Sequence, residues 1–268
     1  MRETYCEFWN WVSDDIMPHF YIISDIHGFY KEMREALDRA GFDPNDDNSW
    51  LISLGDEMDR GPEPEKVINY IMSLPRAIWI KGNHQSLMED LITRGYPRSH
   101  DWHNGTMQSV LSLAPNAKIQ SEAFAVAYEK TKHFFDKAVN YLELDKYILV
   151  HSFVPLVNED GLPTYYTRNK NFSFNPDWRN ASDEEWRDAM WGNPFDLAIK
   201  GLNQTGKTII FGHFHCSYPR SILNGESEFG DDADFSIYYG NGYIGIDACT
   251  AYSDRVNCLV IEDNFKEG

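Results

Sequence analysis

The stretch that decides the fold is Leu51-Ile52-Ser53-Leu54-Gly55-Asp56-Glu57-Met58-Asp59-Arg60-Gly61-Pro62. Its first four residues are typical of a buried strand, and a glycine-bounded acidic loop follows them directly. Open α/β sheets bind ligands at the carboxyl ends of their strands, so this loop is a candidate site. A solvated turn is the alternative, because Gly, Asp and Pro are also the common turn residues. The neighbouring segments distinguish the two interpretations.

Two further apolar strands end in polar, glycine-containing loops. Phe20–Ser24 runs into Asp25-Ile26-His27-Gly28, and residues 77–81 run into Gly82-Asn83-His84-Gln85. Asp25 and His27 are two residues apart and point the same way in an extended chain, so they can share one metal ion. Helices that separate the strands are expected at residues 30–40, 64–73 and 86–93. This alternation predicts a parallel sheet with a site along one edge.

Two later strands lead into histidines. Tyr147–Val150 precedes His151, and Thr208–Phe211 precedes Gly212-His213-Phe214-His215. A histidine in the core is the alternative for each position, but five loops after five strands all carry metal-compatible groups. We expect the second half of a sandwich to include the last two strands, at residues 243–247 and 256–261.

The remaining segments indicate one domain with additions. Residues 1–16 are expected to be an amino-terminal appendage with a short aromatic helix, and residues 17–268 a single α/β domain. Residues 95–141 look like a helical cap insertion, with loop at 96–103 and a helix at 123–141. The segment from Asn171 to Asp188 looks irregular, and we assign it no role.

Composition excludes several classes of protein. The 268 residues include 42 acidic and 24 basic side chains, a formal net charge of -18, which argues against a nucleic-acid duplex as partner. Four irregularly spaced cysteines indicate reduced thiols rather than a disulfide framework. No apolar run approaches the length of a membrane span, and the acidic amino terminus does not resemble a secretory signal. We therefore expect a cytoplasmic protein that does not associate with membranes.

The side chains at the strand ends form a metal-ligand set. Oxygen and imidazole ligands without thiolate suit Mn²⁺, Fe or Zn²⁺. Six ligands exceed one open site, so we expect two divalent ions roughly 3.5–4 Å apart, bridged by Asp56. Asp25 and His27 would complete the first ion, and Asn83, His151 and His213 the second. The predicted ligands are Asp25, His27, Asp56, Asn83, His151 and His213.

Three residues are candidates for the chemistry. Metal ions that lower the pKa of a bound water allow hydroxide to attack phosphorus in line. His84, next to ligand Asn83, would protonate the leaving alkoxide, and Asp59 would orient the His84 imidazole. Arg60 would bind the substrate phosphate through its planar fork, with Asn83 and His84 also lining the substrate position.

These blocks resemble the signature motifs of the metallophosphoesterases, and more narrowly those of the phosphoprotein-phosphatase family in its short bacterial and phage members. The resemblance covers residues 20–261, and the Asp59-Arg60-Gly61 ending is specific to that branch. It implies a β-sandwich flanked by helices, two metal ions, most often Mn²⁺, and hydrolysis of phosphate monoesters on serine and threonine. The implied partner is a phosphorylated protein or a small phosphate ester.

The chain departs from the family pattern in several places. Gln85 replaces the usual Glu, and the small pair after Val-His is Ser152-Phe153, which would put bulk beside the metal. The family's second phosphate-binding arginine has no counterpart in residues 191–195, and we expect Arg168, Arg179 or Arg187 as candidate substitutes. His215 resembles a metal ligand of phosphodiesterases in the wider superfamily.

Two other functions are compatible with these residues. The first is a nucleotide hydrolase acting on diadenosine polyphosphates or cyclic nucleotides, because relatives with one site differ in substrate. Aromatic residues of the cap, including Trp102 and Phe124, would stack on a base there, although core packing explains them equally well. The second is a non-catalytic binding module, which the complete ligand set disfavours.

Overall fold

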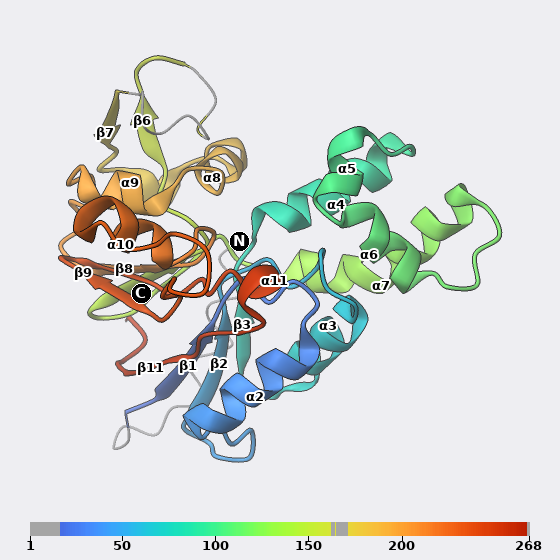
Figure 1. The fold of residues 1–268 in the computed structure, drawn as a ribbon, viewed down its shortest axis with the longest axis horizontal. Helices are drawn as coiled ribbons and strands as arrows, with labels where there is room; N and C mark the ends of the chain where they lie inside the picture. The colour runs from blue at the N-terminus through green and yellow to red at the C-terminus, as the bar shows by residue number, and fades with distance from the viewer. Residues whose placement is uncertain (1–16, 162–163, 165–170, 267–268) are drawn as a thin grey trace.

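Two β-sheets face each other at the centre of the molecule (Figure 1). The structure is a computed structural model that describes residues 17–161, 164 and 171–266. The expected amino-terminal helix and Arg168 lie outside these residues. The first sheet has the order β11-β1-β2-β3, formed by Leu259–Glu262, His19–Ile23, Ser49–Ser53 and Ala77–Trp79.

The second sheet has the order β4-β5-β8-β10-β9. Its strands are Tyr141–Glu143, Tyr147–Val150, Thr208–Phe211, Tyr243–Gly245 and Tyr238–Gly240. In each sheet three neighbouring strands are parallel, namely β1, β2 and β3 in one and β5, β8 and β10 in the other. Antiparallel strands β11, β4 and β9 lie at the edges. A separate hairpin pairs β6 (Leu156–Asn158) with β7 (Phe172–Phe174).

Helices cover the outer faces of both sheets (Figure 1). The first group is α2 to α7, at Tyr30–Ala40, Pro64–Ser73, Asn83–Arg94, Ser99–His103, Thr106–Leu113 and Gln120–Lys137. The second group is α8 to α10, at Asp183–Ala189, Pro194–Ile199 and Ser217–Asn224. A 3-10 turn at Trp178–Asn180 precedes α8, and the short α11 is Thr250–Ser253.

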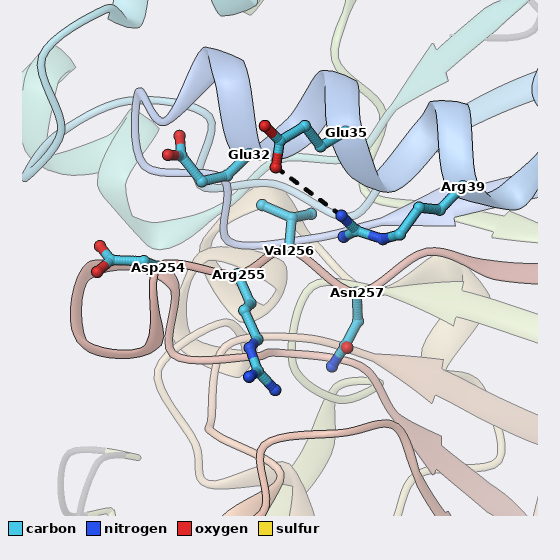
Figure 2. Close-up of a pocket in the computed structure, with 7 residues that line it drawn as sticks. All are labelled: Glu32, Glu35, Arg39, Asp254, Arg255, Val256 and Asn257. Atoms are coloured by element: carbon cyan, nitrogen blue, oxygen red, sulfur yellow. Dashed lines mark ion pairs between the residues drawn. The ribbon is translucent and has the colours of Figure 1, made fainter.

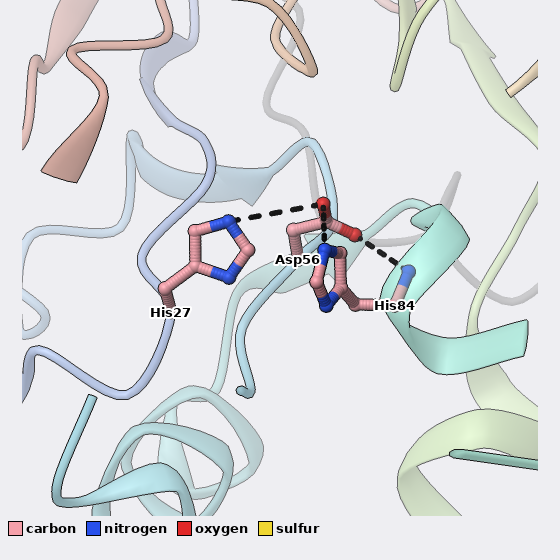
Figure 3. A group of neighbouring side chains, drawn as sticks. All are labelled: His27, Asp56 and His84. Atoms are coloured by element: carbon pink, nitrogen blue, oxygen red, sulfur yellow. Dashed lines mark hydrogen bonds and ion pairs between the residues drawn. The ribbon is translucent and has the colours of Figure 1, made fainter. Parts of the chain in front are cut away.

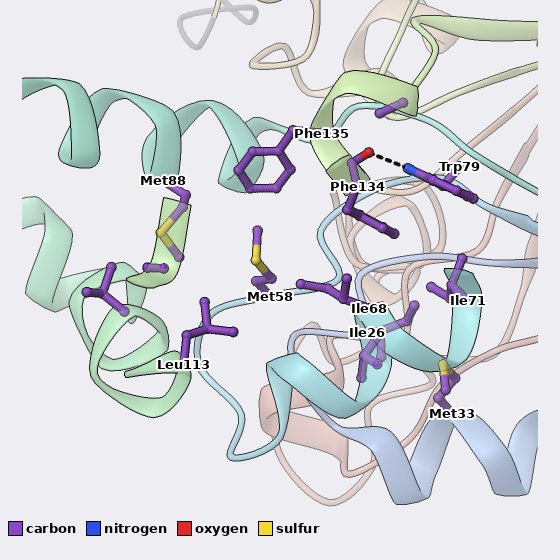
Figure 4. Packing of buried hydrophobic residues seen from close by; sticks show 14 of the residues in the cluster. Ile26, Met33, Met58, Ile68, Ile71, Trp79, Met88, Leu113, Phe134 and Phe135 are labelled. Atoms are coloured by element: carbon purple, nitrogen blue, oxygen red, sulfur yellow. Dashed lines mark hydrogen bonds between the residues drawn. The ribbon is translucent and has the colours of Figure 1, made fainter. Parts of the chain in front are cut away.

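Three apolar clusters hold these layers together. One lies between the sheets and joins Phe20 and Ile52 of the first sheet to Leu149 and Ile210 of the second. Another packs α2, α3, α4, α6 and α7 on the first sheet, where Trp79 stacks on Phe134 at 4.8 Å between ring centroids (Figure 4). A third packs α8 to α10 on the second sheet. The expected α/β sandwich flanked by helices is confirmed.

Several local predictions were wrong. Loop was expected at residues 96–103, where α5 forms, and the helix expected to reach Tyr141 ends at Lys137 because Tyr141 pairs with Val150 in the second sheet. The segment expected to be irregular contains β7 and α8. Strand β11 was expected in the second half of the sandwich, but it pairs with β1 in the first sheet. In the described part of the chain, no helix combines the length and apolarity needed to span a bilayer.

Candidate metal centre

The predicted ligands gather where the parallel strands end. Asp25 and His27 follow β1, Asp56 follows β2, and Asn83 opens α4 after β3. His151 follows β5 and His213 follows β8, so the two sheets contribute from opposite sides. All six side chains are buried or nearly so. The structure therefore brings together the residues that the sequence spreads over 189 positions, from 25 to 213.

Backbone carbonyls orient two of the imidazoles. His27 Nδ1 lies 2.8 Å from the carbonyl oxygen of Met58, and His151 Nδ1 lies 2.7 Å from that of Leu54. A carbonyl can only accept, so each Nδ1 carries the proton and each Nε2 presents its lone pair. This arrangement is the usual support of a metal-ligating histidine.

Asp56 is common to both groups of ligand atoms (Figure 3). Its Oδ2 lies 4.0 Å from His27 Nε2 and 3.5 Å from His151 Nε2. Its Oδ1 accepts a hydrogen bond of 3.0 Å from the backbone N–H of His84, which fixes the carboxylate plane. One oxygen is thus held by the chain while the other faces imidazoles on two sides, as a bridging carboxylate requires.

The second group converges on an amide oxygen. Asn83 Oδ1 lies 2.9 Å from His151 Nε2 and 3.0 Å from His213 Nδ1. Three donor atoms from α4, β5 and β8 therefore point at one another, together with Asp56 Oδ2. Neutral imidazole and amide or carboxylate oxygen are the ligand types that Mn²⁺, Fe and Zn²⁺ accept. The donor set fits a divalent ion here.

Asp25 is placed differently from the other predicted ligands. Its Oδ2 accepts hydrogen bonds from the Ser24 hydroxyl and from the His213 N–H, the latter at 2.8 Å. It is absent from the two groups of converging ligand atoms, although it lies close enough to Asp56 for the two charges to interact. Asp25 is therefore buried beside Asp56, but its carboxylate oxygens are not among the ligand atoms of those two groups.

Asp247 is a buried carboxylate that the sequence analysis did not select. It follows β10 as the ligands follow their strands, and its Oδ1 accepts the Cys249 N–H at 2.6 Å. Burial, with Asp25 nearby, raises the pKa of Asp247 well above its ordinary value. The sequence contains the signal for this residue, because Asp247 stands at the carboxyl end of the strand expected at residues 243–247.

The site residues hold strained backbone conformations. Among the described residues, eight non-glycine residues have positive φ, and six of them are predicted site residues. The left-handed region costs a residue with a Cβ about 1–2 kcal/mol. Such strain persists only where the surrounding structure imposes it. The six residues are Asp25, His27, Asp56, Asp59, Arg60 and His213.

Two glycines allow the loops to approach closely. A Cβ at Gly82 would lie 2.2 Å from Asp56 Oδ1, and a Cβ at Gly212 would lie 2.3 Å from Asp25 Oδ2. Neither position tolerates a side chain without moving a carboxylate. Steric exclusion of a Cβ therefore explains why these two motif positions are glycine.

The charges of the cluster influence one another. Burial raises the pKa of Asp56, but His151, His84 and His27 outweigh it and hold that pKa below its ordinary value. Burial, with His151 next to it, lowers the pKa of His213 to about 3. Burial, together with His84 and Arg60, also lowers the pKa of His27. An ionised carboxylate among neutral imidazoles is the protonation state that a cation needs.

A second network lies beside the ligands. His84 Nδ1 is 2.7 Å from Asp59 Oδ2, and its Nε2 is 3.3 Å from an Arg60 nitrogen. Burial lowers the pKa of His84, but Asp56 and Asp59 outweigh it and raise that pKa. His84 Nε2 is also 3.9 Å from Asp56 Oδ2, so the imidazole faces the ligand cluster (Figure 3). The predicted acid, its predicted orienting carboxylate and the Arg60 guanidinium therefore lie together at the edge of the predicted metal centre.

Comparison with known families identifies the family of this chain. Residues 18–217 match the family model of the calcineurin-like phosphoesterases, which covers more than half of the chain. The chain belongs to the calcineurin-like phosphoesterase family.

Curated relatives of this metallophosphoesterase differ in what they act on. The asymmetrical bis(5'-nucleosyl)-tetraphosphatase PrpE of Halalkalibacterium halodurans is 26% identical over 76% of this chain and 81% of its own. Serine/threonine-protein phosphatase 2 of Escherichia coli is 35% identical over 29% of this chain and 34% of its own. The first curated relatives, all symmetrical bis(5'-nucleosyl)-tetraphosphatases, are matched over only 23–32% of their length.

A solved structure supports the fold. The serine/threonine phosphatase from Saccharomyces cerevisiae with similarity to human phosphatase PP5 superposes with a TM-score of 0.53 at 12% identity. The match covers 96% of this chain and 82% of the yeast chain. This likeness concerns the arrangement of sheets and helices.

The departures from the family pattern have local explanations. Gln85 Nε2 donates to Glu57 Oε2 at 3.2 Å, so an amide at position 85 complements a carboxyl group at position 57. Ser152 donates to the Gly192 carbonyl at 2.7 Å. The expectation that Phe153 puts bulk beside the metal was wrong, because its ring packs in the apolar cluster under α8 and α9.

The candidate substitutes for the second arginine are engaged elsewhere. Arg179 makes two hydrogen bonds to Glu143 of β4, at 2.7 and 2.8 Å. Arg187 pairs with Asp90 of α4 at 2.6 Å. His215 Nε2 lies 3.0 Å from Glu228 rather than among the grouped ligand atoms. The structure therefore leaves Arg60 as the described arginine at the cluster.

A separate pocket of about 410 Å³ lies between α2 and the segment 254–257 (Figure 2). Its lining mixes acidic groups such as Glu32 and Glu35 with basic ones such as Arg39 and Arg255. Arg39 is 3.9 Å from Glu35, so charges of both signs compensate within it. None of its lining residues belongs to the predicted ligand set.

Proposed function

We propose that this metallophosphoesterase hydrolyses phosphate monoesters of the kind found on serine and threonine. The observation that carries the proposal is the network of Asp59, His84 and Arg60 beside Asp56. Hydrolysis of a monoester needs a cationic side chain that binds the terminal phosphate and a general acid that protonates the leaving oxygen. Arg60 and His84 supply these from neighbouring positions.

The metal ions would be held by Asp56 as bridge, with Asp25 and His27 on one side and Asn83, His151 and His213 on the other. Two divalent ions, Mn²⁺ with Fe or Zn²⁺ as alternatives, would activate a water and neutralise charge on the phosphoryl oxygens. The chain's own residues do the rest. Arg60 orients the phosphate, and Asp59 holds the His84 imidazole so that Nε2 can deliver a proton to the leaving oxygen.

A second candidate substrate is a dinucleoside polyphosphate. It is favoured by the relative that matches most of the chain, which is named for bis(5'-nucleosyl)-tetraphosphate hydrolysis. The same ligand set and acid would serve a phosphoanhydride, because relatives with one site differ in substrate. The reaction type is common to both candidates, and only the group beyond the phosphate differs.

Product analysis after Mn²⁺ loading separates the candidates, because a phosphoserine peptide releases inorganic phosphate whereas cleavage of diadenosine tetraphosphate yields nucleotides. We expect turnover of a phosphoserine peptide, with Asp56→Asn as the inactive control because it removes the bridging carboxylate. Cleavage of diadenosine tetraphosphate alone would replace the proposal by the second candidate. The products, either two ADP or one ATP and one AMP, would show which bond of the polyphosphate is cleaved. Turnover of neither substrate would contradict both.

A further inference from the structure

Helix α6 of the cap contacts the loop that carries the predicted acid pair. Gly105, the residue before α6, approaches this loop so closely that a Cβ at position 105 would lie 2.4 Å from the backbone nitrogen of Arg60. One turn later, the Ser109 hydroxyl accepts a hydrogen bond of 2.9 Å from the N–H of Asp59. The cap is therefore fastened to the backbone on either side of the Asp59–Arg60 bond.

Thr106, the first residue of α6, reaches the Asp59 carboxylate itself. Its hydroxyl donates to Asp59 Oδ2 at 2.7 Å, the oxygen that also lies 2.7 Å from His84 Nδ1. Thr106 and Asp59 are both fully buried, at 0% exposure. The other oxygen, Asp59 Oδ1, has no hydrogen-bond partner among the described residues. The Thr106 hydroxyl is thus the side-chain contact that holds the carboxylate in place besides the histidine.

We propose that Thr106 is a positioning residue for proton transfer, and that the cap insertion thereby helps to build the general acid. The inference rests on the proposed role of His84 as that acid. Two bonds to one oxygen fix the rotation of the carboxylate, and the carboxylate fixes the imidazole plane through Nδ1. Without the hydroxyl, the carboxylate can rotate and the imidazole loses its fixed direction toward the leaving oxygen.

The test compares substrates whose leaving groups differ in their need for a proton. The substitution Thr106→Val keeps the shape and removes the hydroxyl. We expect it to lower kcat for a phosphoserine peptide about tenfold and kcat for 2,4-dinitrophenyl phosphate by less than about twofold, since general acids typically contribute 10²–10⁴-fold. Thr106→Ser retains the hydroxyl and should restore the wild-type ratio of the two rates.

A matched control excludes a general packing effect. Thr131 is also a fully buried threonine of the cap, but its hydroxyl donates to the Ala127 carbonyl of its own helix at 2.8 Å. Thr131→Val should leave the ratio of the two rates unchanged. Bound metal, measured by elemental analysis, should be the same in all three variants.

Spectroscopy provides a readout apart from turnover. In the Zn²⁺-loaded protein, we expect a slowly exchanging His84 Nδ1–H resonance in wild type and Thr106→Ser that broadens in Thr106→Val. His84→Ala assigns the resonance and tests the acid itself. Equal losses on both esters in His84→Ala would refute the acid role. If His84→Ala loses more activity on the phosphoserine peptide than on 2,4-dinitrophenyl phosphate, the acid role stands. An unchanged ratio of the two rates in Thr106→Val would then refute only the positioning role of Thr106.

If Thr106→Val does not fold, the variant Ser109→Ala tests whether contacts from α6 position Asp59. Ser109→Ala removes the hydrogen bond to the Asp59 N–H and loosens the same carboxylate through its backbone. A selective loss on the phosphoserine peptide, smaller than tenfold, is expected. An unchanged ratio would overturn the proposal.

Discussion

Glu57 and Gln85 form a buried pair next in sequence to the predicted ligand Asp56 and the proposed acid His84. Glu57 accepts from the Ser53 hydroxyl at 2.6 Å and from Gln85 Nε2 at 3.2 Å. Burial, with Asp56 nearby, raises the pKa of Glu57 to about 8. The pair ties the loop after β2 to the first turn of α4, and these two segments carry Asp56 and His84.

Exchanging the two side chains tests this pairing. Gln85→Glu should destabilise the protein by about 2 kcal/mol, because two carboxyl groups would then meet without water. Adding Glu57→Gln restores one acid and one amide and should recover most of the loss. Urea unfolding of the two single variants and the double variant measures the coupling. Additive losses would show that the two side chains do not interact.

The candidate ligands carry a local sequence pattern, whereas the residues that support them do not. His151 and His213 were found because each directly follows an apolar strand, which is a local pattern. Thr106 lies some 47 positions from Asp59 and carries no local mark of its contact with that residue. Asp247 did follow a strand, but a single aspartate at a strand end is too common to be selected.

At the scale of elements, one carboxylate on the edge strand β4 contacts three cations from other parts of the chain. Glu143 is 7% exposed and contacts Arg179, Lys207 and Lys266, with nitrogen–oxygen distances from 2.7 to 3.0 Å. Burial raises the pKa of Glu143, but these cations outweigh it and lower it to about 2. The pKa in the unfolded chain is near 4.5.

The stability that Glu143 contributes should therefore depend on pH. A depressed carboxylate pKa stabilises the folded state above pH 4.5, and that contribution is lost as pH falls toward 2. Because Arg179 and Lys266 are partly exposed, we expect Glu143→Gln to cost only about 1–2 kcal/mol at pH 7. The cost should shrink by pH 3.5 in urea unfolding.

The exposed pair of Glu65 and Lys130 is the matched control. Glu65→Gln should change stability little at either pH. A cost for Glu143→Gln that stayed the same at pH 7 and pH 3.5 would contradict the assignment.

Elements with local stop signals were predicted well, and those made by pairing were not. Helix α2 ends at Gly41, whose φ of 80° is the left-handed conformation that glycine favours, and α3 begins with Pro64. Strand β4 has three residues and exists because it pairs with β5. Likewise β11 joins the first sheet through its register with β1, which no local pattern encodes.

The whole molecule carries a net charge of -18 around the proposed phosphate-binding site. The distant charges should slow the approach of a phosphate ester, and salt should screen them as the Debye length falls from about 30 Å at 0.01 M to about 8 Å at 0.15 M. We expect kcat/KM for p-nitrophenyl phosphate to rise over this range while kcat stays constant. A fall in kcat/KM would show that the local positive charge of the site governs the encounter.

The six left-handed site residues have a consequence for how such a protein can change over generations. At about 1 kcal/mol each, their backbone strain is comparable to the free energy that keeps a typical domain folded. Glycine at any of these positions would relieve part of it and also remove a functional side chain. Directed evolution for heat tolerance alone would therefore tend to replace the site residues. Selection for turnover must instead keep sheets stable enough to offset the backbone strain of these residues.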